Sequence, residues 1–394
     1  MQYRTDPRSG QQLSALGFGL MRLPRGLTGI DQEQTTALVA QARAGGVNYF
    51  DTAYVYPGSE AALGRALQAL GQRSQIYLAS KLPHQQCQTP ADFDRIFQEQ
   101  LTRLQTDYLD YYLIHNLPTP ALWQRLVDLG IADWLNARQT GGQIRQVGFS
   151  FHGKQADFLE LLTAWDWDFC QIQYNYLDTH YQAGQVGLRA AAQRNIAVII
   201  MEPLRGGKLA GGLPAQAQAM FQAAEPTTSM AAWGLRWIWD QPEPTVVLSG
   251  MNNSNQLADN LVTAAAAGVG NLSAEQRQLF SDVQAVIRAS YKIPCTGCNY
   301  CMPCPHGVNI PDCFAAYNTR AAQGLVAGFT QYMTSITPYA PARYSGPGRC
   351  VSCGRCERKC PQQLPVMADL VEVKKHMEPA WTRPLLAIAR RVMK

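Results

Sequence analysis

Eight cysteines near the C-terminus form two short runs whose spacing suits iron–sulfur chemistry. The runs are Cys295, Cys298, Cys301 and Cys304, then Cys350, Cys353, Cys356 and Cys360. The second run reads C-x2-C-x2-C-x3-C-P, a pattern that binds [4Fe–4S] clusters, and the first has a final gap one residue shorter. In two-cluster ferredoxins the fourth cysteine of a run binds the other cluster. The spacing predicts one or two [4Fe–4S] clusters and transfer of single electrons.

Two other uses of these cysteines fit less well. Structural zinc sites pair two C-x2-C knuckles, whereas here three cysteines follow one another at successive x2 gaps. A disulfide framework is typical of small secreted domains, and this chain has the composition of an intracellular enzyme. The short gap before Cys304 leaves open a single cluster held by the second run. Cys87, Cys170 and Cys313 fit neither run. Cys313 lies close after the first run and is expected to be an ordinary buried cysteine.

A second set of candidate residues lies at the ends of three hydrophobic runs. Asp51, Lys81 and His115 each end a run, and Tyr56 follows the first of them by five residues. A tyrosine hydroxyl can protonate a carbonyl oxygen as hydride reaches the carbon, but its unperturbed pKa is about 10. A nearby lysine ammonium lowers that pKa, and a carboxylate would hold the lysine in place. The spacing does not choose between Tyr54 and Tyr56 as the proton donor.

These residues need a scaffold that brings strand ends together. Short apolar runs alternate with helical patterns about every 30 residues, which predicts parallel strands joined by right-handed crossovers. Eight such units predict a (β/α)8 TIM barrel, whose chemistry lies at the carboxyl ends of its strands. An open doubly wound sheet is the competing fold, weakened by the lack of G-x-G-x-x-G after the first strand. The expected strands are 15–20, 48–51, 76–81, 108–115, 146–150, 169–174, 196–201 and 245–248.

The size and charge of the chain limit the remaining possibilities. Its 394 residues are 46% hydrophobic, enough for a barrel over residues 1–285 and a small helical ferredoxin-like domain over 286–376. Residues 377–394 form a basic amphipathic tail, expected to dock on the protein itself rather than on an acidic partner or lipid. No run is long enough to span a membrane, and a net charge of +5 without basic clusters argues against nucleic acid. Reduced cysteines make the cytoplasm the expected compartment.

The stretch Asp51-Thr52-Ala53-x-x-Tyr56, with Glu60 and Gly64, resembles the opening signature of the aldo-keto reductase family. The resemblance implies that Tyr56 is the proton donor, completing a tetrad with Asp51, Lys81 and His115. It covers roughly residues 1–285, and with the cysteine tail it is similar to the ferredoxin-containing branch of the family. Further matching segments are Gly148-Phe149-Ser150, Gln171-x-Gln173-Tyr174-Asn175, Glu202-Pro203-Leu204, Ser249-Gly250-Met251 and Asp259-Asn260.

The resemblance also implies a nicotinamide cofactor, NADP(H) with NAD(H) as the alternative, bound without a Rossmann fold. Ser150 and Gln171 would hold its carboxamide, and Met201 would cover the ring. Gly250 and Gln256 stand where many members place a lysine and an arginine for the 2′-phosphate. His152 would replace an amide donor or pack in its loop. The implied cofactor residues are Gly19, Leu20, Met21, Ser150, Gln171, Met201, Pro203, Leu204, Arg205, Gly250, Asn252, Gln256, Asp259 and Asn260.

Together these features predict a carbonyl oxidoreductase coupled to its clusters. Hydride would pass between the nicotinamide and a small aldehyde or ketone, and the clusters would exchange single electrons with a redox partner protein. One alternative is a nicotinamide-binding redox sensor with little carbonyl turnover, and another is that the clusters only stabilise the tail. The protein is expected to be a monomer.

Overall fold

The computed structural model describes residues 1–26, 29–336 and 344–379. Its N-terminal part contains a closed barrel of eight parallel strands, which confirms the predicted (β/α)8 fold. The barrel closes because β12 (Pro244–Ser249) pairs with β3 (Leu16–Gly19), with Val247 opposite Leu16, so the open-sheet alternative is wrong. The strands are β3 (Leu16–Gly19), β6 (Tyr49–Asp51), β7 (Tyr77–Leu82), β8 (Leu109–Ile114), β9 (Ile144–Phe151), β10 (Phe169–Gln173), β11 (Ala197–Met201) and β12 (Pro244–Ser249).

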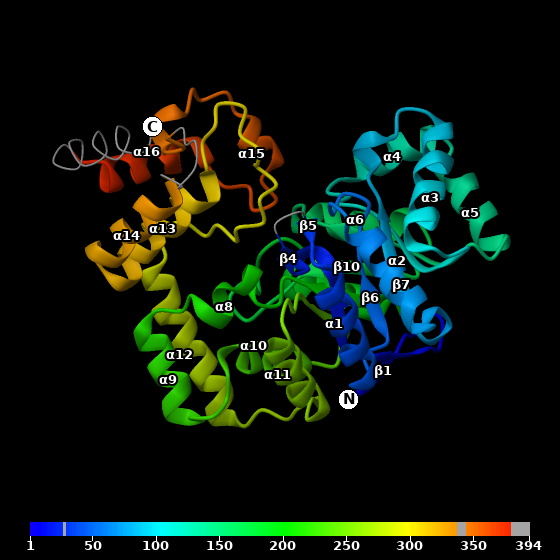
Figure 1. Ribbon diagram of the computed structural model, residues 1–394, viewed down its shortest axis with the longest axis horizontal. Helices are drawn as coiled ribbons and strands as arrows, with labels where there is room; N and C mark the ends of the chain where they lie inside the picture. The colour runs from blue at the N-terminus through cyan, green and yellow to red at the C-terminus, as the bar shows by residue number, and fades with distance from the viewer. Residues whose placement is uncertain (27–28, 337–343, 380–394) are drawn as a thin grey trace. The chain divides into compact units, whose positions relative to one another are not determined.

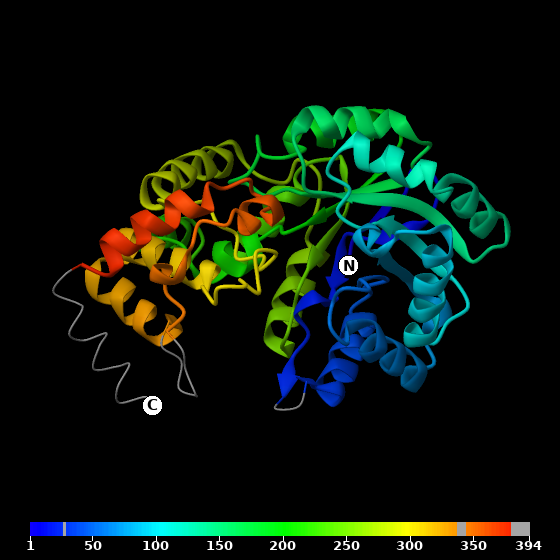
Figure 2. The ribbon, with the colours of Figure 1, turned by 90° about the horizontal axis from the view of Figure 1, so that it is seen from above.

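Helices surround these strands, as Figures 1 and 2 show for the blue and cyan parts of the chain. Two of these helices begin at capped residues: Asp31 accepts a hydrogen bond from the Gln34 backbone N–H, and Thr89 and Asp92 form a capping box at the start of α3 (Pro90–Leu104). Gly64 lets α2 (Ser59–Leu70) and α3 approach closely, because a Cβ there would lie 2.4 Å from the Arg103 carbonyl oxygen. The main helices are α1 (Gln32–Ala44), α2 (Ser59–Leu70), α3 (Pro90–Leu104), α4 (Pro120–Asp128), α5 (Ile131–Thr140), α6 (Gln155–Ala164), α7 (Gly184–Gln193), α10 (Met230–Trp239) and α11 (Ser254–Ala265).

The chain divides into two compact units. The first comprises residues 1–204 and 231–273, and the second comprises 205–230 together with 274–394. The second unit has its own buried core, which includes Ile293, Phe314, Tyr332 and Val373. Its elements are η4 (Arg205–Gly207), α8 (Lys208–Gly211), α9 (Ala215–Ala224), α12 (Ala274–Ser290), α13 (Ile310–Gln323), α14 (Leu325–Ile336), η5 (Pro347–Arg349), α15 (Arg355–Lys359) and α16 (Val366–Met377).

Two features of the C-terminal part concern its helices and its tail. Residues 314–327 do not form one helix, because Gly324 ends α13 with a φ of +94°. Residues 380–394, which carry most of the amphipathic tail, lie outside the described residues. Within the described part of the chain, none of the helices has both the length and the apolar character that a bilayer crossing demands.

Candidate functional site

A buried ion pair joins the carboxyl ends of two neighbouring barrel strands. Asp51 is the last residue of β6, and Lys81 lies in β7, which pairs with β6. The Lys81 ammonium donates to both Asp51 carboxylate oxygens, at 2.6 and 2.7 Å, and to the Thr52 carbonyl at 2.7 Å. Burial raises the pKa of Asp51 and lowers the pKa of Lys81, while the charge of each opposes the shift of the other. Three hydrogen bonds therefore fix the ammonium at one position.

The geometry separates the two candidate tyrosines. The Lys81 ammonium lies 5.2 Å from the ring centroid of Tyr56, and the His115 ring lies edge-on to that tyrosine with centroids 6.0 Å apart. The Tyr54 hydroxyl instead donates to Glu99 at 2.7 Å, and the Arg103 guanidinium stacks 4.3 Å from its ring. The structure thus brings Tyr56, and not Tyr54, together with the lysine and the histidine.

His115 directly follows β8 and is 6% exposed. Burial, the charge of Lys81 and two further histidines hold its pKa well below 6.5, so the imidazole is neutral near pH 7. One of these, His152, bonds Gln182 at 3.0 Å, and burial lowers its pKa to about 4. The other, His84, was missed in the sequence although it lies only three residues after Lys81. A neutral His115 can donate an N–H to a carbonyl oxygen without being the source of the proton.

Ser150 and Gln171 face each other across adjacent strands, because they are register partners in β9 and β10. The Ser150 hydroxyl accepts the Asn116 N–H at 2.7 Å and keeps its own proton to donate. Gln171 is 2% exposed, and its side-chain oxygen has no hydrogen-bond partner among the described residues. A buried orphan acceptor of this kind is costly unless a ligand satisfies it. One donor beside one acceptor fits the oxygen and the amino group of a carboxamide.

Four of the implied cofactor residues lie in α11 or just before it: Asn252, Gln256, Asp259 and Asn260. The Gln256 side-chain oxygen accepts the Asn252 N–H at 3.0 Å, so this amide closes the loop onto itself. Asn260 is buried and donates to the Ser249 hydroxyl at 2.7 Å. Asp259 precedes Asn260 on the same helix. These contacts hold the loop between β12 and α11 in shape.

The structure adds a cation to this region that the sequence reasoning overlooked. A Cβ built on Gly250 would lie 3.8 Å from the Cβ of Arg22, so the side chain of Arg22 begins beside this glycine. Arg22 is exposed and follows Gly19, Leu20 and Met21 at the end of β3. The predicted cofactor segment stopped one residue short of it.

The segment after β11 carries the remaining predicted cofactor residues. Met201 ends β11 and is partly exposed, and Pro203 and Leu204 follow it. Arg205 belongs to the second unit, is 2% exposed and donates to the Pro294 carbonyl at 3.0 Å. Lys208 donates to the Cys295 carbonyl at 2.5 Å. The segment that begins at Arg205 therefore holds the start of the first cysteine run.

The two cysteine runs fold alike. In each run the residues two and four positions after the first cysteine have positive φ: Gly297 and Asn299, then Ser352 and Gly354. The backbone N–H of Gly297 points at the Cys295 thiol at 3.4 Å, and that of Ser352 points at the Cys350 thiol at 3.5 Å. Matching turns of this kind wrap a short run around a shared centre and direct amide dipoles toward thiolates.

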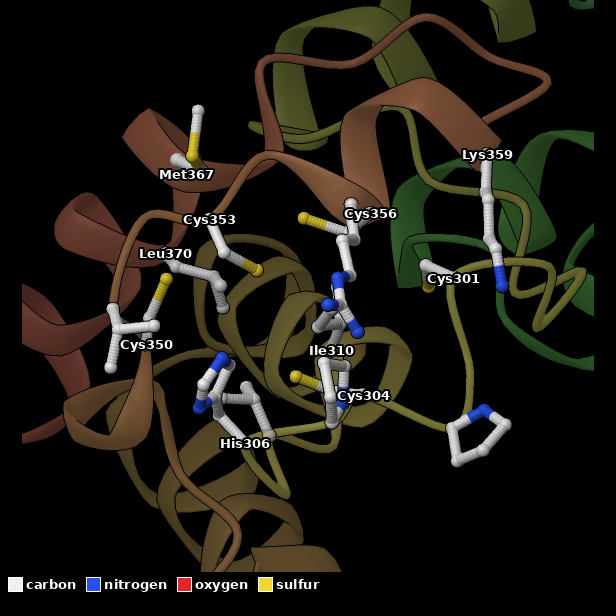
Figure 3. Close-up of a pocket in the computed structure, with 15 residues that line it drawn as sticks. Cys301, Cys304, His306, Ile310, Cys350, Cys353, Cys356, Lys359, Met367 and Leu370 are labelled. Carbon is white, nitrogen blue, oxygen red and sulfur yellow. The ribbon is translucent and has the colours of Figure 1, made fainter.

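The fourth cysteine of each run lies near thiols of the other run. Cys304 lines one cavity with Cys350, Cys353 and Cys356 of the second run, and Figure 3 shows these four sulfurs turned into it. Cys301 lines this cavity as well. Burial raises the pKa of Cys301 to about 12, with Cys295, Cys298 and Cys360 adding to the rise. In the described part of the chain, no three His, Cys, Asp or Glu side chains are arranged to hold a single metal ion. The grouping fits the crossed ligation of a two-cluster ferredoxin.

Comparisons with known proteins agree with both halves of the chain. The model of the Aldo/keto reductase family matches residues 15–280, and a 4Fe-4S dicluster domain matches residues 294–364. An aldo-keto reductase of Mycobacterium marinum is 29% identical over 61% of this chain and 80% of its own length. Two solved folds are similar: an aldo-keto reductase of Bacillus halodurans in its holo form and one of Klebsiella pneumoniae in complex with NADPH. The Bacillus halodurans protein has a TM-score of 0.60 at 24% sequence identity, and the match covers 72% of this chain and 96% of that protein. The Klebsiella pneumoniae protein has a TM-score of 0.59 at 22% sequence identity, and the match covers 72% of this chain and 95% of that protein.

Proposed function

Because the chain belongs to the aldo/keto reductase family, we propose that it reduces an aldehyde or ketone with NADPH, or oxidises the corresponding alcohol. The observation that carries the proposal is the Lys81 ammonium, which is hydrogen-bonded to both Asp51 oxygens and lies 5.2 Å from the Tyr56 ring. A buried cation held so closely beside a phenol suits a group that must protonate or deprotonate substrate. The family makes oxidoreduction the expected use of that proton.

Each of the four residues has a distinct task in this reaction. The nicotinamide supplies or accepts the hydride when it is bound. Tyr56 gives its phenolic proton to the substrate oxygen, and the neighbouring Lys81 charge favours the phenolate that remains. Asp51 keeps Lys81 charged in its buried position, and the neutral His115 orients the carbonyl oxygen by an N–H. Ser150 and the orphan oxygen of Gln171 hold the carboxamide.

Arg22 supports the proposed preference for NADPH. Its side chain begins beside Gly250, one of the positions where the family's 2′-phosphate cations are lacking, and an exposed guanidinium binds phosphate well. We expect Arg22→Gln to raise the KM for NADPH about tenfold or more, since one charge-assisted contact contributes roughly 1.5–3 kcal/mol. The KM for NADH should stay the same. Initial rates with both cofactors check this, and equal changes for the two would rule out a 2′-phosphate contact.

The C-terminal domain would hold two [4Fe–4S] clusters with exchanged fourth ligands. One cluster would be bound by Cys295, Cys298, Cys301 and Cys360, and the other by Cys304, Cys350, Cys353 and Cys356. The shared cavity of Cys304 with the second run supports this assignment, as does Cys360, which adds to the rise in the pKa of Cys301. Two clusters can divide the two electrons of a hydride into single electrons.

Paired cysteine variants test the exchange directly. Cys298→Ser/Cys360→Ser removes two ligands of the same cluster, so about four irons per chain should remain. Cys298→Ser/Cys304→Ser removes one ligand from each cluster, and most of the iron should be lost. Iron and acid-labile sulfide in anaerobically purified protein give the answer, with Cys313→Ser as a buried control outside both runs. The opposite ranking of the two pairs would show that each run holds its own cluster.

One assay separates this function from that of a redox sensor. NADPH oxidation is followed anaerobically with a panel of aldehydes and ketones, beside a parallel sample that contains no carbonyl compound. A carbonyl oxidoreductase consumes NADPH in step with alcohol formed. A sensor binds NADPH and reduces its clusters but forms no alcohol with any member of the panel.

A further inference from the structure

The second cysteine run presents an exposed face, the basic face, formed by Val351, Cys353, Arg355, Arg358 and Lys359. Cys353 is the only exposed cysteine of the eight in the two runs, and Val351 is 59% exposed beside it. An exposed ligand brings the edge of a bound cluster close to solvent. This is the position from which an electron can reach another protein.

The charges of this face are of one sign. Arg355, Arg358 and Lys359 are all exposed and form no ion pair with any of the residues that the structure describes. The nearest acid in the sequence, Glu357, is turned toward α16, where its carboxylate accepts the Met367 N–H at 2.9 Å. Three cations that form no ion pair with the described residues therefore lie within six residues of the exposed cysteine in the sequence.

A simpler role for these cations is to balance the negative charge of the cluster itself. Arg355 and Lys359 line the cavity that holds the second group of cysteines and can serve that role. Arg358 does not line the cavity, yet it is exposed on the same short helix, α15. The basic face thus carries one positive charge, that of Arg358, in addition to the two that line the cavity. It also has an exposed apolar side chain, Val351, which suits an interface.

We propose that the basic face is the docking surface for a small acidic one-electron carrier protein, such as a [2Fe–2S] ferredoxin. The inference rests on the proposed cluster at Cys304, Cys350, Cys353 and Cys356. In the step concerned, one electron passes from the reduced carrier to the oxidised cluster, or back, and no bond forms or breaks. Opposite charges on the two faces steer the encounter and raise its rate at low ionic strength.

Stopped-flow mixing of reduced plant-type [2Fe–2S] ferredoxin with the oxidised full-length protein tests this docking. The second-order rate of bleaching near 400 nm is measured between about 20 and 300 mM salt, a range over which screening becomes strong. We expect the wild-type rate to fall steeply with salt. The triple variant Arg355→Gln/Arg358→Gln/Lys359→Gln should lower the rate at low salt at least tenfold and flatten its salt dependence. Arg358→Glu alone should also lower the rate at low salt. The control Lys154→Gln/Lys374→Gln/Lys375→Gln removes the same charge from exposed positions elsewhere and should leave the rate unchanged.

The outcomes distinguish failure of this inference from failure of the proposed function on which it rests. Protein that contains no iron would remove the cluster, and with it the basis for docking. Iron-loaded protein whose rate falls equally in the basic-face and control variants would overturn the docking surface alone. The docking surface would also be overturned if the basic-face variants shifted the reduction potential but left the salt dependence intact, since the cations then serve only the cluster. Sedimentation with anionic phospholipid vesicles that depends on Arg358 would assign the face to a membrane instead.

Discussion

Tyr56→Phe is expected to lower kcat/KM for carbonyl reduction by about 10²–10⁴-fold, the usual contribution of a positioned proton donor. The substitution removes one hydroxyl and leaves the ring, with its edge contact to His115, in place. NADPH affinity should change little, because no residue proposed for the cofactor is altered. Steady-state rates with the best aldehyde of the panel and a fluorescence titration of NADPH measure the two effects.

The neighbouring tyrosine provides a matched control. Tyr54→Phe removes the hydrogen bond to Glu99, so we expect a loss of stability of about 1 kcal/mol and turnover within about twofold of the wild type. If Tyr54→Phe abolished turnover and Tyr56→Phe did not, the roles assigned to the two residues would have to be exchanged.

Lys81→Met should have the largest effect on stability. It leaves the Asp51 carboxylate buried, 3% exposed, with no cation beside it, and breaking a buried pair in this way typically costs about 3–5 kcal/mol. Turnover should fall as well, since no charge then favours the Tyr56 phenolate. Urea unfolding of the metal-replete protein, followed by circular dichroism, gives the change in the free energy of unfolding.

A double variant distinguishes the two consequences of losing Lys81. Asp51→Leu/Lys81→Met removes both charges, and an apolar pair of similar volume should restore most of the lost stability. The rate of carbonyl reduction should not recover, because the tuning charge is still absent. Recovery of both stability and rate would mean that the pair serves only to hold the barrel together.

The arrangement of the barrel was predictable because its signal is local and repeated. Each unit pairs a short apolar run with an amphipathic helix, and the polar residues Asp51, Lys81 and His115 mark where strands end. Those strand ends must converge in a parallel barrel. The cysteine runs were equally readable, since the spacing within a few residues fixes how turns place the thiols.

Other features depend on contacts between distant residues and leave no local signal. The choice between Tyr54 and Tyr56 rests on Glu99 and Arg103, which lie more than forty residues after Tyr54. Glu99 accepts the hydrogen bond of the Tyr54 hydroxyl, and the Arg103 guanidinium stacks on the Tyr54 ring. Nothing in the periodicity indicates that residues 205–230 group with the C-terminal unit, because that grouping rests on bonds such as Lys208 to the Cys295 carbonyl. Arg22 was overlooked for the same reason, as only the fold brings it beside Gly250.

The most direct test follows the hydride itself. The protein is incubated anaerobically with NADPH deuterated at both C4 positions and with the carbonyl panel, and the products are examined by mass spectrometry. We predict that at least one carbonyl compound yields an alcohol that carries a single deuterium, and that Tyr56→Phe yields far less of it. Oxidation of the NADPH without deuterium in any alcohol, or equal deuterium transfer by the variant, would contradict carbonyl reduction at Tyr56.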